Sequence, residues 1–378
     1  MMSISKNKIV FVVNTPGFFL SHRLPLAKAA KNTGLEVHVA TANGPGIDTI
    51  LSNGFVHHVV PFSRSGQNPY LEMKTIFFLL RLFYRLRPRL VHLVTIKPVL
   101  YGGLVSRILG IDAVVFAVSG LGTVFLEKSV IGKFRKAFVL FFFRAAFKNK
   151  RYAAIFQNID DQNELISSRV VLKSRSYIIK GSGVALHEYP FYPEPNGRVV
   201  VAMAARLLKD KGVYEFVQAA RLLDQKGVNV EMRLIGAPDH GNPTSITQQE
   251  LDAWSKEGVI SLLGHREDIA HQYAVAHIAC LPSYREGLPK GLIEAAACGR
   301  CIVTTDVPGC RDAIIPEKTG VLVPVKDAAA LAAALEALVK SPLKRQRMGR
   351  AGRNLAESVF AIENIVEKHL HIYNSLLD

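Results

Sequence analysis

The chain has 378 residues, a length that exceeds one ordinary hydrophobic core and predicts two domains. Apolar residues make up 49% of it and charged residues 21%, a composition that excludes a disordered chain. The formal net charge of +16 leaves nucleic acid, anionic lipid and acidic substrates as partner classes. No helix-turn-helix, zinc or RNA-binding signature accompanies the charge, so we expect no nucleic-acid partner.

The amino-terminal half predicts alternating strands and helices. Its first apolar run, residues 8–13, has the pattern of a buried strand and is too short for a secretory signal. A helix is expected at 22–32. The alternation predicts a doubly wound parallel sheet. The predicted strands of this half are residues 8–13, 36–40, 56–61, 90–94, 113–118 and 153–157.

Two segments of this half combine cations with aromatic residues and leucines, at 74–89 and 133–151. Such composition is typical of helices that lie in a membrane surface, and arginines interrupt both segments too often for a membrane span. The alternative is two sheet-covering helices with solvated basic faces, which explains the first segment almost as well. For the second segment we favour the membrane, because one buried stripe does not need so many phenylalanines. They are Phe138, Phe141, Phe142, Phe143 and Phe147.

A proline-rich stretch at 189–197 interrupts two apolar patterns and predicts the linker between domains. We therefore expect a first domain over residues 1–188 and a second over 189–360. A final helix is expected within residues 361–378.

In the second half, two cations follow the predicted strand 199–204. Arg206 and Lys211 lie in the loop that leads to a helix pattern starting at Gly212. Ligands in open α/β sheets bind outside the carboxyl ends of the strands, where helix starts and added cations stabilise a diphosphate. The loop therefore predicts a site for a phosphorylated ligand.

Two carboxylates follow a second apolar run, residues 276–281. Glu286 is expected on the loop after that strand, and Glu294 on the following helix, which should stop at Gly299. Side chains on a helix tilt toward its amino terminus, so both carboxylates can face one mouth and accept hydrogen bonds from a polyol. The alternative is that Glu286 is a loop charge and Glu294 an ion-paired helix residue.

These motifs resemble, in type and order, the retaining glycosyltransferases of family 4, which have the GT-B fold: two facing Rossmann-like doubly wound domains with a cleft between them. The resemblance covers most of the chain and is strongest over residues 199–312. It implies that Arg206 and Lys211 bind the donor diphosphate, Glu294 the ribose hydroxyls and Glu286 the donor sugar. It assigns the nucleobase to Gly264 and Arg266, and the phosphate and sugar also to Gly287, Leu288 and Pro289. It also implies that the final helix crosses back to the first domain.

The amino-terminal half looks like family members that extend sugars on polyprenyl diphosphate in bacterial surface glycan synthesis. The matching stretches are residues 16–23, 92–102 and 118–125. By this resemblance Gly17 lets its loop approach the donor phosphates, and the acceptor is bound by His22, Arg23, Lys97 and Gly120. Each has an alternative: Gly17 could make a turn, His22 could cap a helix, Lys97 could be solvated, and His92 is expected as a buried core histidine.

Catalysis in such an enzyme consists of stabilising the charge that develops on the departing diphosphate. Arg206, Lys211 and helix-start amides supply that stabilisation, so we expect neither a metal nor a cofactor besides the UDP-sugar donor. Cys298 and Cys301 lack the second ligand pair of a zinc site and are expected to be buried in a reducing compartment. The resemblance favours attack by the acceptor on the face that the diphosphate leaves.

The combined prediction is a peripheral enzyme of the cytoplasmic face of the inner membrane. It moves a sugar, expected to be an N-acetylhexosamine, from a UDP-sugar to a polyprenyl-diphosphate-linked saccharide, and its other partner is an anionic membrane surface. The alternatives are a cytosolic family 4 enzyme with a soluble acceptor and a non-catalytic subunit that binds nucleotide sugars. A GT-B epimerase would need an acid and base set that the sequence does not show.

Overall fold

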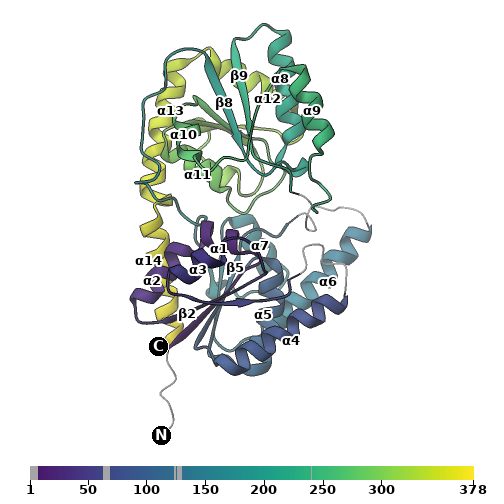
Figure 1. Cartoon of the computed structure of the whole chain (residues 1–378), viewed down its shortest axis with the longest axis vertical. Helices are drawn as coiled ribbons and strands as arrows, with labels where there is room; N and C mark the ends of the chain where they lie inside the picture. The colour runs from purple at the N-terminus through teal and green to yellow at the C-terminus, as the bar shows by residue number, and fades with distance from the viewer. Residues whose placement is uncertain (1–6, 63–68, 123–124, 126–129, 240) are drawn as a thin grey trace. The chain divides into compact units, whose positions relative to one another are not determined.

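The computed structural model describes residues 7–62, 69–122, 125, 130–239 and 241–378. The chain forms two compact units, each built on one parallel sheet (Figure 1). The first unit ends at Ser182 and takes up Glu363–Asp378, and the second unit is Gly183–Ile362. The two Rossmann-like sheets confirm the predicted fold class.

The sheet of the first unit has seven strands in the order β3-β2-β1-β4-β5-β6-β7. Every pairing in it is parallel, and the strand order reverses between β1 and β4, where Ile9 lies beside Leu90. Sequence predicted six of these strands to within a few residues and missed the short β7. The strands are β1 (Lys8–Val12), β2 (Glu36–Thr41), β3 (Val56–Val59), β4 (Leu90–Val94), β5 (Ala113–Val118), β6 (Tyr152–Phe156) and β7 (Ser176–Ile178).

The helix predicted at 22–32 corresponds to Leu24–Asn32, and a first helix, Pro16–His22, precedes it and ends before Arg23. Pro25 lies in the first turn of the second helix, where its missing N–H costs no hydrogen bond; within a continuous helix it would break the ladder. The first-unit helices are α1 (Pro16–His22), α2 (Leu24–Asn32), α3 (Ile47–Ser52), α4 (Pro69–Leu86), α5 (Ile96–Leu109), α6 (Val130–Ala146), α7 (Ile159–Ser167) and α14 (Ile362–Leu377).

Helices α4, α5 and α6 cover one face of the first sheet and share one hydrophobic core (Figure 1). Phe143 of α6 and Phe147 just after it belong to that core, so these two of the five phenylalanines form the buried stripe of the segment. Phe138 and Phe141 are exposed, at 66% and 64%. No helix in the described parts of the chain is long and apolar enough to cross a membrane.

The other face of the first sheet is covered in part by α14. Ile365, Ile372 and Tyr373 pack into that core. The Tyr373 hydroxyl lies 2.5 Å from Nδ1 of His92, and the rings of His92 and His369 stack. Burial and the nearby Arg23 cation lower the pKa of both histidines, that of His369 to about 3. His92 is thus a core histidine, as the sequence analysis expected.

The sheet of the second unit has six strands in the order β10-β9-β8-β11-β12-β13, and all pairings are parallel. Here the order reverses between β8 and β11. The strands are β8 (Val199–Ala204), β9 (Val230–Ile235), β10 (Ser261–Gly264), β11 (Ile278–Leu281), β12 (Cys301–Thr305) and β13 (Gly320–Val323).

Helices pack on this second sheet around one continuous core. Gly299 has φ +73°, the left-handed conformation that ends a helix, and it stops α11 as predicted. The second-unit helices are α8 (Val213–Gln225), α9 (Gln248–Glu257), α10 (Ile269–Ala274), α11 (Lys290–Ala297), α12 (Ala328–Val339) and α13 (Pro342–Leu355).

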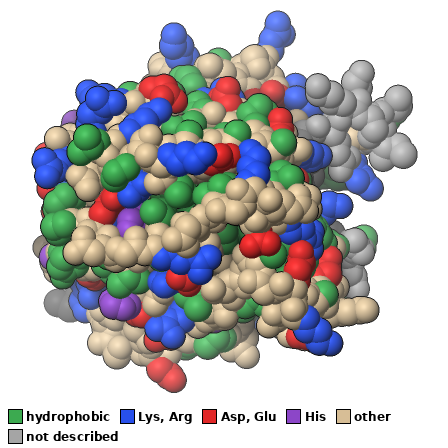
Figure 2. Space-filling model, turned by 90° about the horizontal axis from the view of Figure 1, so that it is seen from above, with side chains coloured by type: hydrophobic (Ala, Val, Ile, Leu, Met, Phe, Trp, Pro, Cys, Tyr) green, Lys and Arg blue, Asp and Glu red, His purple; other side chains and the backbone are tan. Residues whose placement is uncertain are grey.

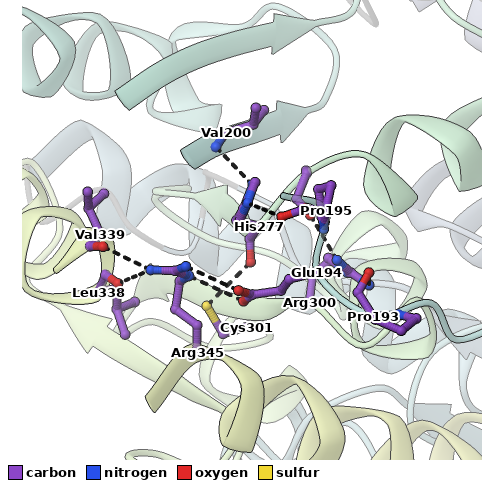
Figure 3. Close-up of polar contacts among 11 residues, drawn as sticks. Pro193, Glu194, Pro195, Val200, His277, Arg300, Cys301, Leu338, Val339 and Arg345 are labelled. Atoms are coloured by element: carbon purple, nitrogen blue, oxygen red, sulfur yellow. Dashed lines mark hydrogen bonds and ion pairs between the residues drawn. The ribbon is translucent and has the colours of Figure 1, made fainter. Parts of the chain in front are cut away.

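The proline-rich stretch is fixed to the second unit by a buried ion pair (Figure 3). Arg345 donates to both carboxylate oxygens of Glu194, at 3.2 and 3.1 Å, and its third nitrogen donates to the carbonyls of Leu338 and Val339. The two side chains are only 5% and 8% exposed. Beside them, His277 donates to the Pro195 carbonyl at 3.0 Å.

Replacing Glu194 by alanine should lower the free energy of unfolding of this unit by about 3 kcal/mol, because a buried cation loses its counter-charge. Urea unfolding followed by the fluorescence of Trp254, the single tryptophan, measures this unit. Glu188→Ala, at an exposed position, is the control and should change the midpoint little. Equal midpoints for the two variants would contradict a stabilising role of the pair.

Candidate functional site

The candidate site of the second unit begins where the loops after β8 and β11 touch. Gly212 has φ +76°, and a Cβ there would lie 2.1 Å from the carbonyl oxygen of Pro282. The Asp210 carbonyl accepts hydrogen bonds from the Tyr284 amide at 2.9 Å and from the Ser283 hydroxyl at 3.0 Å. The absence of a side chain at Gly212 therefore lets the two loops close on each other.

This contact brings Lys211 and Glu286 together as an ion pair. Their side chains are 18% and 12% exposed, and the Ser283 hydroxyl donates to the same carboxylate oxygen at 2.8 Å. The Glu286 amide donates to the Pro308 carbonyl, and a Cβ on Gly309 would lie 2.5 Å from the Glu286 carbonyl oxygen. The Glu286 loop is thus held from both sides.

Arg206 and Arg266 are exposed, in contrast to Lys211. Arg206 pairs with Asp239 at 2.8 Å, and Arg266 pairs through two nitrogens with Asp268, also at 2.8 Å. The hydrogen bonds from Arg266 hold the pKa of the Asp268 carboxyl below its ordinary value. Exposed ion pairs contribute little to stability, so either guanidinium can exchange its carboxylate for an anionic ligand at small cost. Gly264, the last residue of β10, is also exposed.

Glu294 is buried on α11 and has two partners. Its Oε1 accepts a hydrogen bond from the Tyr189 hydroxyl at 2.7 Å and lies 3.1 Å from Nζ of Lys290. Burial and the Glu294 charge raise the pKa of Tyr189. Sequence reasoning missed Tyr189, because it is 105 residues from Glu294 and no local pattern links them.

Three residues, Gly287–Pro289, connect Glu286 to the first turn of α11. Gly287, Leu288 and Pro289 are buried, and Pro289 is the residue before the first helical turn. The amides at the start of a helix have no partner within the helix and form a donor set for an anion. The start of α11 is therefore a candidate donor set for an anion, and it directly follows the loop that begins at Glu286.

In the first unit, Gly17 lies inside α1 rather than in a turn, and a Cβ there would meet nothing within 4 Å. The fold therefore gives no conformational reason for a glycine at this position, and the turn explanation is wrong. Gly120 differs, because its φ of +112° itself favours glycine.

His22 and Lys97 follow β1 and β4, the two strands at which the order of the first sheet reverses. The His22 ring stacks on Phe18, with centroids 4.0 Å apart, and its Nδ1 lies 2.7 Å from the Ser21 hydroxyl. Lys97 pairs with Glu72 of α4 at 2.9 Å. Both side chains remain partly exposed.

Arg23 is only 3% exposed, and Nη1 of its guanidinium donates to the His22 carbonyl at 2.9 Å. Burial lowers the pKa of its guanidinium to about 10, and the neighbouring Tyr373 opposes that shift. Sequence gave no signal of this burial, because the covering helix α14 comes from the far end of the chain.

The four cysteines are buried and unbridged. Burial raises the pKa of the Cys298, Cys301 and Cys310 thiols to about 12, and that of Cys280 is raised as well. Cys301 lies against the His277 carbonyl, at 3.7 Å (Figure 3). Within the described residues, no group of three or more His, Cys, Asp or Glu side chains is arranged to hold a metal.

Ligands of open α/β sheets bind at the point where the strand order reverses, and Lys211 and Glu286 lie at that point of the second sheet. Family models define the class of protein: residues 188–355 match glycosyl transferases group 1, and residues 8–158 match glycosyl transferase 4-like domains. The chain belongs to this glycosyltransferase family and is a transferase, as the sequence analysis predicted.

Two relatives align with nearly the whole chain. One is the N,N'-diacetylbacillosaminyl-diphospho-undecaprenol alpha-1,3-N-acetylgalactosaminyltransferase of Campylobacter jejuni, 27% identical, with 95% of this chain and 98% of the relative covered. The other is the capsular polysaccharide biosynthesis glycosyltransferase CapM of Staphylococcus aureus, 24% identical, with 98% of each covered.

Solved structures agree on the fold. A sucrose-phosphate synthase from Thermosynechococcus elongatus has a TM-score of 0.80 at 20% identity and covers 98% of this chain and 99% of its own. HepE from Anabaena, in complex with UDP and glucose, has a TM-score of 0.75 at 18% identity and covers 97% and 99%. These neighbours confirm the GT-B fold.

The contact at Gly212 can be tested against a glycine with the same backbone and no neighbour. Gly227 has φ +65° with nothing within 4 Å of its Cβ position, so Gly227→Ala should cost only the backbone strain, about 1 kcal/mol. Gly212→Ala should cost more, because its methyl group also meets the Pro282 carbonyl. Urea unfolding by Trp254 fluorescence compares them, and equal losses would show that the close approach contributes nothing.

Proposed function

We propose that this transferase moves an N-acetylhexosamine from a UDP-sugar to a polyprenyl-diphosphate-linked saccharide in bacterial surface glycan synthesis. The observation that carries the proposal is the half-buried ion pair of Lys211 with Glu286 at the sheet's reversal point. The Campylobacter relative, by its name, transfers N-acetylgalactosamine to a saccharide on diphospho-undecaprenol, and the Staphylococcus relative makes capsular polysaccharide. Both align over their full length with this chain.

In this proposal, donor binding exchanges the partners of the ion pair between Lys211 and Glu286. When a UDP-sugar arrives, its diphosphate offers Lys211 a stronger anionic partner than one carboxylate, and Arg206 can leave Asp239 for the same phosphates. Glu286 is then released to accept hydrogen bonds from the sugar hydroxyls, while Ser283 still orients it. Glu294, which Tyr189 holds in place, accepts from the ribose hydroxyls.

Charge on the departing diphosphate is stabilised by Lys211, Arg206 and the amides of Gly287 and Leu288 at the entry of α11. Those groups are fixed before the reaction, so little reorganisation is needed as charge develops. Under this proposal the acceptor attacks on the face that the diphosphate leaves, its proton passes to the leaving phosphate oxygen, and the new linkage is α. Gly264 and Arg266 contact the nucleobase.

The acceptor belongs, in this proposal, to the first domain. Lys97 and His22 bind its saccharide or diphosphate. Nothing lies within 4 Å of the Cβ position of Gly17, so phosphate or sugar can approach the backbone there, and the resemblance assigns Gly120 to the same acceptor. Arg23 is buried, so its part is to hold the backbone of His22 through their hydrogen bond.

A membrane surface suits the exposed faces of α4 and α6. On α6, Phe134, Phe138 and Phe141 form a stripe at helical spacing and are 74%, 66% and 64% exposed. On α4, each residue of a similar stripe, Tyr70, Met73, Phe77 and Tyr84, is at least 63% exposed, and the same helix exposes Lys74, Arg81 and Arg85. Aromatic rings among cations are typical of a peripheral contact with anionic lipid, here on the cytoplasmic face of the inner membrane.

Substituting either Lys211 or Glu286 by alanine should lower turnover by a factor of about 100 or more, since each loses a charged contact to the donor. The assay is UDP release from a panel of UDP-, GDP- and ADP-sugars, with and without a polyprenyl-diphosphate saccharide and with EDTA present. Lys226→Ala, which breaks an exposed ion pair of the same unit, is the control and should stay active. Normal activity in either site variant would refute the site, and release with a soluble acceptor alone would refute the lipid-linked acceptor.

The triple variant Phe134→Ser/Phe138→Ser/Phe141→Ser should bind vesicles that contain phosphatidylglycerol at least about tenfold more weakly. The reason is that it lacks the three apolar rings whose transfer from water into the membrane surface stabilises binding. The matched control replaces three exposed aliphatic residues that lie on separate helices, Leu51, Ile159 and Leu343, by serine. Vesicle sedimentation measures binding. Equal binding by the two triple variants would show that the α6 stripe is not the membrane contact.

A further inference from the structure

A basic pocket lies at the amino edge of the first sheet, the edge opposite to the one that carries Gly17 and Lys97. Its volume is about 680 Å³, and it lies where the chain enters β4, β5 and β6. The cations that line it are Arg89, Arg107, Lys148, Lys150 and Arg151. The proposed transfer reaction uses none of them.

None of these five cations forms an ion pair with a carboxylate of the described residues. Backbone carbonyls hold the arginines instead: Arg89 donates to Leu377 at 2.6 Å, Arg107 to Ala145 at 3.3 Å, and Arg151 to Leu376 at 3.4 Å. A guanidinium has five N–H groups, so each arginine is oriented and still has donors left for a ligand.

Part of this positive charge balances the partial negative charge at the carboxyl ends of helices α5, α6 and α14. The carboxyl end of each helix contributes about half a negative charge. The side chains of Asp112 and Asp378 and the α-carboxylate of Asp378 add three carboxylates to the pocket lining. Together these negative charges fall short of the five cations. The pocket therefore keeps a net positive charge after the helix ends and carboxylates are counted.

A second hollow of about 350 Å³ continues the pocket through Lys148 and Asn149. It adds Arg144, Arg169 and Arg175, and no carboxylate lines it. The face drawn in Figure 2 is different, because there Lys and Arg side chains are interspersed with Asp, Glu and apolar ones. Cations that form no ion pair with the described residues thus lie around both hollows.

We propose that this pocket binds a phosphate-bearing ligand with two or more negative charges. Oriented guanidinium groups beside flexible ammonium groups suit phosphate oxygens, and a volume of this size accommodates a phosphorylated head group or a small phosphate ester. The ligand is either free in solution or the head group of an anionic lipid. The pocket does not depend on the proposed transfer reaction.

The test compares two pairs of charge-removing substitutions in the full-length chain. Lys148→Gln/Lys150→Gln removes two exposed pocket cations whose side chains form no hydrogen bond with the described residues. The control, Lys256→Gln/Lys318→Gln, removes two exposed lysines elsewhere and gives the same net charge. Thermal unfolding first checks that both variants are folded.

Inorganic pyrophosphate is the free probe, titrated by calorimetry, and vesicles of phosphatidylcholine with or without phosphatidylglycerol are the lipid probe. The pocket variant should bind pyrophosphate at least about tenfold more weakly than the control. Pyrophosphate bound at the donor site would be the same in both variants, so only their difference counts. If the pocket variant also binds phosphatidylglycerol vesicles more weakly than the control, the ligand of the pocket is a lipid head group. If its vesicle binding is unchanged, the ligand is a free phosphate compound.

Two outcomes would overturn the proposal. Equal pyrophosphate binding by both variants and the parent chain would show that the pocket has no phosphate site. Loss of vesicle binding with unchanged pyrophosphate binding would show a diffuse attraction to charged surfaces rather than a pocket. Arg107→Gln, on a different element, repeats the test with a single substitution.

Discussion

The arrangement depends on one constraint of parallel sheets: where the strand order reverses, the two loops that leave adjacent strands run in opposite directions and expose the edge between them. In the second unit this point lies between β8 and β11, and in the first between β1 and β4. In the second unit, Lys211 follows β8 and Glu286 follows β11. In the first unit, His22 follows β1 and Lys97 follows β4. Lys211 and Glu286, which are 75 residues apart in sequence, thus meet because of strand order.

At the reversal point of the second unit, backbone geometry decides how close the loops come. Gly212 and Gly309 both have positive φ, and at both a side chain would meet a backbone carbonyl of the opposite loop. The charges of Lys211 and Glu286 therefore lie within contact distance without a ligand, and their pairing neutralises a half-buried site. Under the proposed function, a donor diphosphate therefore has to compete with the Glu286 carboxylate for Lys211.

Much of this could be predicted from sequence because it is local. Buried parallel strands appear as apolar runs, and the loops after them carry the charged motifs, so β8, β11 and α11 with Glu286 and Glu294 were found. Long-range contacts had no such signal. Tyr189 reaches Glu294 across 105 residues, and α14 buries Arg23 from the other end of the chain. On α6, composition could not say which phenylalanines face the core; helical position separates buried Phe143 from exposed Phe141.

The state of the four cysteines has a practical consequence. All are buried and their thiols ionise well above neutral pH, so the chain offers almost no thiolate to an alkylating reagent while it is folded. A single cysteine introduced at an exposed position such as Phe134 or Lys148 could carry a fluorophore or spin label without removal of the native ones. Site-specific spectroscopy can therefore follow the natural sequence with one substitution at a time.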